Sequence, residues 1–554
     1  MTLESETPIA SQRFYLGDAE GAVVGALQTL AAERASARLW AGDATLFSDD
    51  PAHAASVATR LGWLRSPAAM QREQEQLIAF AREAHARGLR RALVLGMGGS
   101  ALCPEVLAKV YGSSSESLTL RVLDTTDPTY VLEAARFAEP RETLFIVASK
   151  SGSTIEVSAL EATFFERAQA ALGAGAAQHF IAITDPGSPL TELANARGYA
   201  RVFENDPNIG GRYSALSHFG LVPAALAGVD LKALLQSAEA MVAHCSPEVP
   251  DAENPGLQLG AFIGGLARAG RDKLSLIASP EVAPLGAWIE QLVAESTGKQ
   301  GVGVVPVDQE PLADAASYGA DRAFVYLRYG AQDVTALDAR VEQLLAAGHP
   351  VARIDLTAKH ELGGEFFRWE IATSLASALL RVNPFDEPNV TEAKRETARF
   401  IQELIEQGAL PERPGLAPTA PEVGAFLRDV SPPNYLAICA YLTPSQALDA
   451  RLATLRAFVQ GHTRSATTTG YGPRFLHSTG QLHKGGPPSG RFLVLTMDDP
   501  HVAIPGLPYS FGQLKRAQAL GDLAVLERRG RTACHVHLGS DPVAGLEALL
   551  SALR

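Results

Sequence analysis

The sequence predicts an α/β protein built from two doubly wound parallel sheets, with a helical N-terminal and an α/β C-terminal addition. Two observations lead to this class. Short apolar runs alternate with helical stretches from residue 89 onward. Several of these runs end in loops rich in Gly, Ser, Thr or Asp. Repeated strand–loop–helix units are typical of parallel sheets with helices on both faces. Ligands bind at the carboxyl ends of such strands, so we look for chemistry in those loops.

The chain has 554 residues, which is enough for about three to four domains. We predict a helical N-terminal segment, a first and a second α/β subdomain, and a C-terminal α/β region, at residues 1–88, 89–245, 246–410 and 411–554. The N-terminal helices are indicated by three-to-four apolar spacing over residues 27–39 and 70–85.

Each α/β subdomain is predicted from its own series of strands. The first has buried strands at residues 92–95, 120–123, 144–147 and 180–183. The second has strands at 273–278, 323–327 and 351–356, with helices at 283–297, 337–347, 362–380 and 388–406. After a Pro-rich stretch at 411–422, further α/β elements are predicted at 435–441, 444–460, 492–496, 510–528 and 534–538.

Composition and charge narrow the function classes. Hydrophobic residues make up 46% of the chain and charged residues 20%, as in soluble globular proteins. With 48 Lys and Arg against 61 Asp and Glu, the net charge of −13 predicts no general attraction to nucleic acid or to anionic membranes. Any anionic substrate must therefore be met by a local concentration of positive charge.

The cysteines and the N-terminus favour a cytoplasmic protein. The four cysteines lie far apart without a CxxC pair, which argues against a disulfide scaffold or a zinc ribbon. The first residues are acidic, whereas a signal peptide begins with basic residues and an apolar run. No apolar run approaches the length of a membrane span. We expect no membrane partner.

Two predicted strand-end loops could hold an anion. The loop Gly96-Met97-Gly98-Gly99-Ser100 joins a strand to a helix, where glycines allow close backbone approach, although many such turns serve packing alone. The loop Ser149-Lys150-Ser151-Gly152-Ser153-Thr154 is more specific because it combines four hydroxyls, a lysine and a glycine at a helix start. We predict that it binds a phosphate; an ordinary helix cap is the alternative.

Further motifs extend these two loops into a family pattern. Gly210-Gly211-Arg212-Tyr213-Ser214, Gln291 to Lys299 (QLVAESTGK) and Asn383 to Lys394 (NPFDEPNVTEAK) follow in order along the chain. Together with the two loops they resemble the phosphoglucose isomerase family, which is built from sugar isomerase domains. Residues 470–486 resemble the isomerase half of bacterial transaldolase–phosphoglucose isomerase fusions.

This resemblance implies a cytoplasmic glucose-6-phosphate isomerase that works through a cis-enediol, without cofactor or metal, and forms a homodimer. Phosphate would be held by Ser149, Lys150, Ser151 and Thr154, with Gly99 and Ser100 lining the pocket. Gln291 would assist the catalytic base. Three departures are Thr297 in place of the family's Asn, Glu387 in place of its Gln and Asn389 in place of its Gly. A carboxylate at 387 would repel a phosphate.

Glu295 suits the base that moves a proton between C2 and C1. Gln291 and Glu295 share one helix face, and Glu295 lies in the last turn before Gly298. The negative end of the helix dipole should raise the pKa of a carboxylate there toward neutrality.

The resemblance assigns the other catalytic roles. Arg212 would stabilise the enediolate and Lys394 would assist ring opening. For the ring-opening histidine, which the family takes from a neighbouring subunit, we choose His360; His477 and His483 are rivals. The strand pair His535 and His537 is interpreted as structural, since no third metal ligand is evident.

Three other activities stay open or are disfavoured. The pocket could also accept mannose 6-phosphate, since the epimers differ at one hydroxyl. A non-catalytic sugar-phosphate regulator could use the same domains, but it would not need Glu295, Arg212 and Lys394 together. A glucosamine 6-phosphate synthase is disfavoured because residue 2 is Thr2, where a nucleophilic cysteine would be needed.

Overall fold

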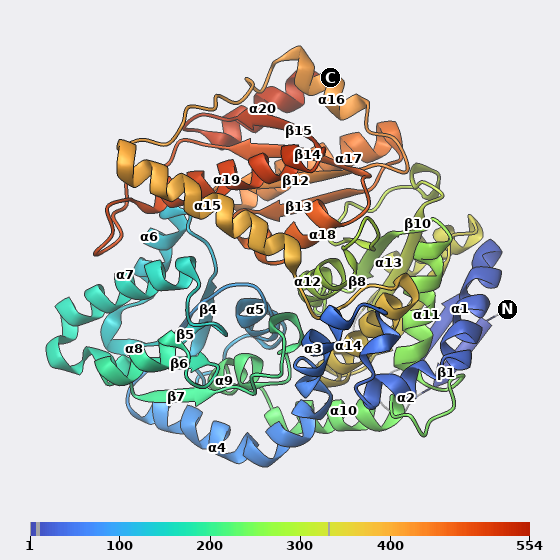
Figure 1. Cartoon of the computed structure of the whole chain (residues 1–554), viewed down its shortest axis with the longest axis horizontal. Helices are drawn as coiled ribbons and strands as arrows, with labels where there is room; N and C mark the ends of the chain where they lie inside the picture. Colours follow the sequence, from blue (N-terminus) through green and yellow to red (C-terminus); the bar gives the residue numbers. More distant parts are fainter. Residues whose placement is uncertain (1, 7–10, 331–332, 554) are drawn as a thin grey trace.

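The computed structural model describes residues 2–6, 11–330 and 333–553 and confirms an α/β fold with parallel sheets. Three sheets form three units that surround a centre where α5 (Gly99–Tyr111), α12 (Leu285–Thr297) and α18 (Gly480–Gly485) meet (Figure 1). Within the described residues no helix is both long and apolar enough to cross a membrane. All four cysteines are buried and unpaired.

The first unit is a five-stranded parallel sheet in the order β4-β3-β5-β6-β7. Its alternate residues face two apolar cores, because helices cover both sides. The strands are β3 (Arg91–Gly96), β4 (Thr119–Leu123), β5 (Thr143–Ala148), β6 (Phe180–Thr184) and β7 (Arg201–Glu204). Besides α5, the helices are α4 (Ser66–Ala86), α6 (Pro128–Phe137), α7 (Ile155–Leu172), α8 (Pro189–Arg197), α9 (His218–Leu226) and α10 (Leu231–His244).

The second unit is a six-stranded mixed sheet in the order β1-β2-β11-β10-β8-β9. The strands are β1 (Thr2–Glu6), β2 (Ser11–Tyr15), β8 (Lys273–Ala278), β9 (Val305–Val307), β10 (Arg322–Tyr329) and β11 (Val351–Leu356). The helices are α1 (Glu20–Ala32), α2 (Ala35–Trp40), α3 (Pro51–Ala58), α11 (Pro255–Arg268), α12, α13 (Thr335–Ala346) and α14 (Leu362–Leu380). The α14 helix is buried along almost its whole length between α10, α11 and α12.

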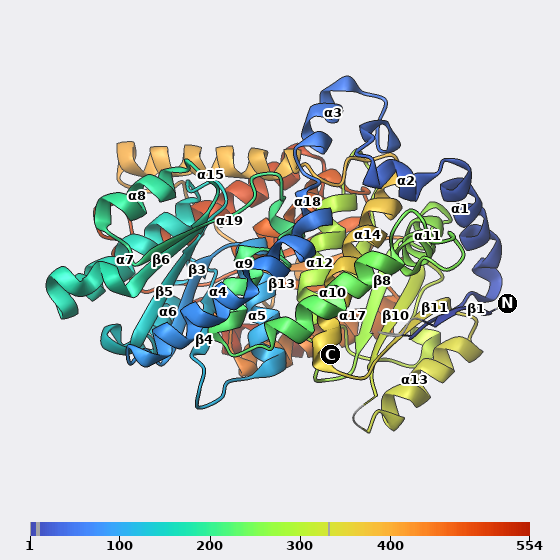
Figure 2. The same cartoon turned by 90° about the horizontal axis from the view of Figure 1, so that it is seen from below.

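The N-terminal segment is less helical than its apolar spacing predicted. Besides α1 to α4 it contributes β1 and β2. The β2 strand runs antiparallel to β11, and β1 pairs with β2 as the edge strand of the sheet (Figure 2). Gln12 and Phe14 of β2 face inward and alternate with outward residues. A five-residue alternation is too short to stand out beside longer helical periodicity, so this strand was not predicted.

The third unit is a four-stranded parallel sheet, order β13-β12-β14-β15. Its strands are β12 (Tyr435–Tyr441), β13 (Thr467–Tyr471), β14 (Gly490–Thr496) and β15 (Thr532–His537). One face packs on α16 (Pro421–Arg428), α17 (Gln446–Thr463) and α20 (Pro542–Leu553), and the other on α18 and α19 (Phe511–Arg528). We did not predict β13, because its three threonines lack an apolar pattern.

The helix α15 (Pro388–Gln407) belongs spatially with this third unit. The sequence analysis placed it in the second subdomain, but it packs along α19 (Figure 1). Ion pairs from Glu392 to Arg529 (2.8 Å) and from Glu396 to Arg528 (2.6 Å) join the two helices.

Buried charge also ties the third unit to the first. Lys515 of α19 lies 2.7 Å from the carboxylate of Asp127, at the start of α6, and 2.5 Å from that of Asp499. Asp127 further accepts a hydrogen bond from Thr443 (2.9 Å). Lys515 and Asp127 are both buried, so the loops that follow β4 and β12 are held in fixed register.

Candidate active site

Glu295 lies in the last turn of α12, as predicted, and its side chain is buried. Gln291, one turn earlier, donates from Nε2 to Oε2 of Glu295 at 3.1 Å. Gly298 caps the helix with φ −78°, which is not the left-handed conformation of most C-cap glycines. Glycine is needed there for space, since a Cβ would lie 2.5 Å from Cα of Leu482 in α18.

Arg212 is fixed beside Glu295 by five contacts. Its Nη1 lies 3.2 Å from Glu295 and 3.2 Å from Glu387. Its Nη2 donates to the carbonyls of Pro384 (2.6 Å) and Asp386 (2.8 Å). Its Nε donates to Ser296 (2.9 Å). Burial opposes the charge of Arg212, but Glu295 and Glu387 more than offset it, so the pKa of Arg212 stays above its ordinary value.

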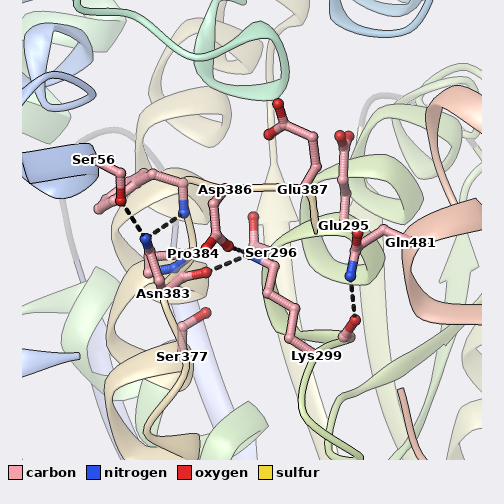
Figure 3. Close-up of polar contacts among 12 residues, drawn as sticks. Ser56, Glu295, Ser296, Lys299, Ser377, Asn383, Pro384, Asp386, Glu387 and Gln481 are labelled. Carbon is pink, nitrogen blue, oxygen red and sulfur yellow. Dashed lines mark hydrogen bonds and ion pairs between the residues drawn. The ribbon is translucent and has the colours of Figure 1, made fainter. Parts of the chain in front are cut away.

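The pKa of Glu295 is raised above its ordinary value. Burial is the main cause, and the negative charge of Glu387 adds to it, whereas Arg212 works in the opposite direction. The direction agrees with the sequence expectation, but desolvation comes first among the causes, where we had expected the helix dipole. Figure 3 shows the carboxylates of Glu295 and Glu387 extending side by side to the same side of the site.

Buried polar contacts hold the loop that carries Glu387 in place. Lys299 is buried, pairs with Asp386 at 2.9 Å and donates to the carbonyl of Asn383 (Figure 3). Burial lowers the pKa of Lys299 to about 8, and Arg212 contributes to the lowering. Asn383 donates to Ser56 at 2.7 Å. These contacts fix the backbone from which Glu387 reaches Arg212.

The predicted phosphate loop, Ser149 to Thr154, lies at the start of α7. Ser149 and Thr154 hydroxyls are 3.1 Å apart, and Ser149 accepts from the amide of Gly152 (3.1 Å). Thr154 is the N-cap residue but makes no side-chain capping bond, so an ordinary helix cap does not explain this loop. Ser151 and Ser153 are exposed. The uncapped N–H groups of α7 and these hydroxyls suit an anion.

Lys150 contacts groups outside this loop. Its ammonium pairs with Asp185 and donates to the carbonyl of Pro207 (2.8 Å). Its charge is therefore already matched by a carboxylate, and the structure gives it no contact with the hydroxyls of Ser149, Ser151 or Thr154 among the residues described.

The glycine loop before α5 has a packing function. Gly98 has φ +56°, and a Cβ there would lie 3.0 Å from Nε2 of Gln291. A Cβ on Gly99 would lie 1.8 Å from the carbonyl oxygen of Gly211. Both glycines are therefore explained by packing. Their lack of a side chain leaves room for Gln291 beside Gly98 and for the Arg212 loop beside Gly99. Ser100 is buried in the first turn of α5.

Lys394 and His477 converge on a buried carboxylate that the sequence analysis did not single out. Nε2 of His477 lies 3.0 Å from Oε1 of Glu156 in the first turn of α7. The carbonyl of His477 accepts from Gln291 Nε2 at 2.8 Å. Lys394, exposed on α15, lies close enough to lower the pKa of Glu156. Glu156 stands two residues after Thr154, which was the only sequence signal for it.

The structure does not join His360 to the site. It is exposed in a short 3-10 turn, Lys359–Glu361, that packs against α10. In the described part of the chain it shares no hydrogen bond or ion pair with Glu295, Arg212 or Lys394. The neighbouring Lys359 donates to the carbonyl of Val110 (2.6 Å), which anchors the turn elsewhere.

Three other histidines named in the sequence analysis have structural surroundings. His483 is buried between the rings of Phe475 and Phe492, and burial holds its pKa well below the ordinary value. His535 and His537 both contact the hydroxyl of Thr496, at 2.9 and 3.1 Å. Among the described residues no group of three His, Cys, Asp or Glu could hold a metal ion.

The order of strands and the site define a protein of the sugar isomerase class: parallel α/β units with a hydroxyl-rich loop at a helix start and a buried Glu–Arg pair. The fold agrees with solved structures. A hypothetical protein of Thermus thermophilus has a TM-score of 0.58 and 26% identity, covering 68% of this chain and 97% of that one. A glucose-6-phosphate isomerase of Chlamydia trachomatis has a TM-score of 0.61 and 21% identity, covering 73% and 90%.

Sequence comparison specifies the class further. Residues 68–310 match the family model described as phosphoglucose isomerase. A glucose-6-phosphate isomerase of Rubrobacter xylanophilus is 30% identical over 424 residues, which cover 68% of this chain and 94% of that protein. One from Thermus thermophilus is 35% identical over 240 residues, 43% of this chain and 56% of that protein. The chain belongs to the phosphoglucose isomerase family.

Proposed function

We propose that this chain is a glucose-6-phosphate isomerase, which interconverts glucose 6-phosphate and fructose 6-phosphate in glycolysis and gluconeogenesis. The observation that carries the proposal is the buried contact of 3.2 Å between Glu295 and Arg212. A base and a fixed cation side by side are what an enediol mechanism needs. The glucose-6-phosphate isomerases to which the chain is similar support the same reaction.

Glu295 takes the proton from C2 of the open-chain aldose and returns it to C1, and the reverse for the ketose. Its raised pKa brings it toward the neutral range in which one group both accepts and donates. When the proton leaves C2, negative charge develops on the enediolate oxygens. Arg212 is held beside Glu295 by five contacts, and its positive charge stabilises the developing negative charge. Gln291 holds the carboxylate of Glu295 in place.

The phosphate binds at the start of α7. Ser149, Ser151 and Thr154 supply hydroxyls, and the first N–H groups of the helix supply donors. Gly99 and Ser100 form the neighbouring wall at the start of α5. Lys150 supplies the positive charge of this loop, and its ammonium also pairs with Asp185.

Lys394 lies near Glu156 and assists ring opening at the ring oxygen. The protein acts in the cytoplasm as a homodimer, as the resemblance implies, and needs neither cofactor nor metal. It has no nucleic acid or membrane partner, in keeping with the net charge of −13.

A coupled assay that reads glucose 6-phosphate formation from fructose 6-phosphate tests the proposal. The wild type should turn over, and Glu295→Gln should lose about 10²–10⁴-fold or more in kcat while keeping its fold. Glu403→Gln on α15, with the same change in charge, is the matched control. Binding of fructose 6-phosphate without turnover by the wild type would favour a sugar-phosphate regulator instead.

A further inference from the structure

The carboxyl edge of the third sheet (β12 to β15 in Figure 1) carries a cavity that the proposed reaction does not use. In the order β13-β12-β14-β15 the strand sequence reverses between β12 and β14, and parallel α/β sheets bind ligands beside such a reversal. The reversal itself is filled here, because Asp127 of the first unit accepts from Thr443 after β12 and pairs with Lys515. The cavity lies next to it, over the ends of β14 and β15.

This cavity has the size of a small-molecule site. Its volume is about 580 Å³, and such sites usually measure about 300–1,000 Å³. The walls come from the loop after β14, the first turns of α19 and the Pro-rich stretch before α16, with His537 at the end of β15. Glu295, Arg212 and the phosphate loop are not among the lining residues. A ligand in the cavity would therefore occupy a second site.

Positive charge in this cavity is only partly matched. Arg516 of α19 forms no ion pair within the described chain, and its guanidinium donates only to the carbonyl of Arg413, at 3.4 Å. Arg413 pairs with Glu527, but these side chains are 33% and 54% exposed, and such pairs contribute little. Burial lowers the pKa of His535 to about 4, and the nearby charges of Arg516 and Arg413 add to the lowering. Two guanidiniums thus gather where an anion could bind both.

The start of α19 adds a backbone donor to the same cavity. The N–H of Phe511 donates to the carbonyl of Val502 (2.9 Å), and that of Gln513 donates to the hydroxyl of Ser510 (3.3 Å). Between them, the N–H of Gly512 has no partner among the described residues, and Gly512 lines the cavity. This helix has 18 residues, and the positive end of its dipole favours an anion at this point.

The carboxylates in the wall do not cancel this positive charge. Asp499 pairs with Lys515 at 2.5 Å, and Asp498 lies 3.2 Å from Nε2 of His537. Glu412 is exposed at the rim. Asp498 is 65% exposed, so its carboxylate and that of Glu412 can still accept hydrogen bonds from hydroxyl groups. The cavity therefore offers donors to an anion and acceptors to a hydroxylated group beside it.

Buried contacts hold α19 in the position that this site requires. Lys515, next to Arg516, is buried between Asp127 and Asp499. Gln518, one turn after Leu514, donates to Glu156 and accepts from Thr126, both at 2.7 Å. These contacts fix the backbone that carries Gly512 and Arg516. A site that is already in place loses less entropy when a ligand binds.

We propose that this cavity binds a phosphate monoester of a small hydroxylated metabolite, at a site separate from the phosphate loop of α7. The phosphate lies between Arg413, Arg516 and the N–H of Gly512, because guanidinium and backbone N–H groups bind phosphate oxygens well. The hydroxylated part lies toward Asp498 and Glu412. This inference does not rest on the proposed isomerase function, since binding here needs neither turnover nor Glu295.

The first test follows chemical modification of Arg516, which is partly exposed. Phenylglyoxal modifies accessible guanidiniums, and peptide mass spectrometry gives a rate for each arginine. Fructose 6-phosphate, AMP or both should slow the modification of Arg516. At ten times the concentration that halves the rate, the slowing should be about tenfold, because about a tenth of the sites stay empty. Arg82, exposed on α4, should react at an unchanged rate.

The two phosphate esters also identify the rest of the ligand. Protection by fructose 6-phosphate alone indicates a sugar phosphate, and protection by AMP alone indicates a nucleotide. Fructose and adenosine lack the phosphate and should not protect Arg516. Equal protection by these two compounds would overturn the proposal. So would the absence of protection by either ester up to about 10 mM, which is ten times a Kd of about 1 mM.

The second test separates this cavity from the catalytic site. Gly152→Ala should weaken the phosphate loop, because the φ angle of Gly152 is +67°. The concentration of the protecting ester that halves modification of Arg516 should change by less than about twofold in this variant, since distant sites act independently. A rise in that concentration in step with KM would overturn the proposal. Glu295→Gln should keep the protection, so that a failure of the proposed isomerase function is distinguishable from a failure here.

The third test removes the guanidinium itself. In Arg516→Met, half-protection measured at Arg413 should need at least about tenfold more of the phosphate ester, because a charge-assisted hydrogen bond is lost. Arg82→Met, with the same change in charge, should leave that concentration unchanged. An unaltered urea midpoint shows that Arg516→Met has folded. Undiminished protection of Arg413 in the folded variant would overturn the proposed phosphate position.

Discussion

Replacing Glu387 by Gln should move the pH profile of the enzyme without removing any group that transfers a proton. Glu387 shares Nη1 of Arg212 with Glu295, at 3.2 Å from each. Its charge opposes ionisation of Glu295 and contributes to the raised pKa of that carboxyl. The Gln variant removes this charge and leaves Arg212 to pair with Glu295 alone. Both changes favour the ionised base.

The size of the effect follows from these two contacts. Because each is 3.2 Å long, the two carboxylate oxygens lie no more than about 6.4 Å apart. Two unit charges at that distance repel by about 0.6 kcal/mol in a dielectric of 80 and about 2.6 kcal/mol in one of 20. These energies correspond to about 0.5 and 1.9 pKa units. Glu387 is 44% exposed, so the lower half of that range applies.

The assay is the pH dependence of kcat/KM for fructose 6-phosphate. Glu295 must be ionised to accept a proton, so activity rises with pH through its pKa. A lower pKa in Glu387→Gln therefore moves the acidic limb to lower pH, by about 0.5–1 unit. Glu403→Gln, which changes net charge equally, should leave the limb in place. An unchanged limb in Glu387→Gln, or a shift to higher pH, would refute the electrostatic role of Glu387.

Three further predictions test the loop and the interdomain contacts. Gly152→Ala should raise KM for fructose 6-phosphate by about tenfold or more. The φ angle of Gly152 is +67°, and the new Cβ would lie 2.6 Å from the amide nitrogen of Leu190. An unaltered KM would contradict a rigid phosphate loop. Lys150→Met should raise KM by less than about fivefold, because the lysine is paired with Asp185 in a partly exposed ion pair worth about 1 kcal/mol or less. A rise in KM of about a hundredfold would mean that Lys150 contacts the phosphate directly. Lys515→Met should lower the free energy of unfolding, measured by urea denaturation, by about 3–5 kcal/mol, because Asp127 is left buried without its cation. The control Lys232→Met, at an exposed lysine, should change the free energy of unfolding by less than about 0.5 kcal/mol.

The parts of the fold that the sequence predicted well are those with long, strong patterns. The predicted strands at 273–278, 351–356 and 435–441 coincide with β8, β11 and β12, and the helix at 362–380 coincides with α14. Continuous apolar runs bounded by polar loops indicated these boundaries. The β2 and β13 strands escaped because one is short and the other is rich in threonine. Their formation depends on neighbouring strands far away in the sequence.

The sequence predicted those parts of the site whose residues lie within a single motif. It did not predict the contacts between residues that are far apart in the chain. The structure brings Glu295, Arg212 and Gln291 together, and each lies in a motif that the sequence already showed. The ion pair between Lys150 and Asp185 joins loops that follow two different strands. The pairing of His477 with Glu156 spans 321 positions, so no local pattern could predict it.

Transfer of a proton by Glu295 is tested most directly by isomerising fructose 6-phosphate in D2O and reading deuterium at C2 of the glucose 6-phosphate formed, by NMR. The wild type should incorporate solvent deuterium at C2, because the base exchanges its proton with water during the lifetime of the enediol. Folded Glu295→Gln should show neither turnover nor incorporation. Deuterium incorporation at the wild-type rate in Glu295→Gln would contradict the assignment of Glu295 as the base.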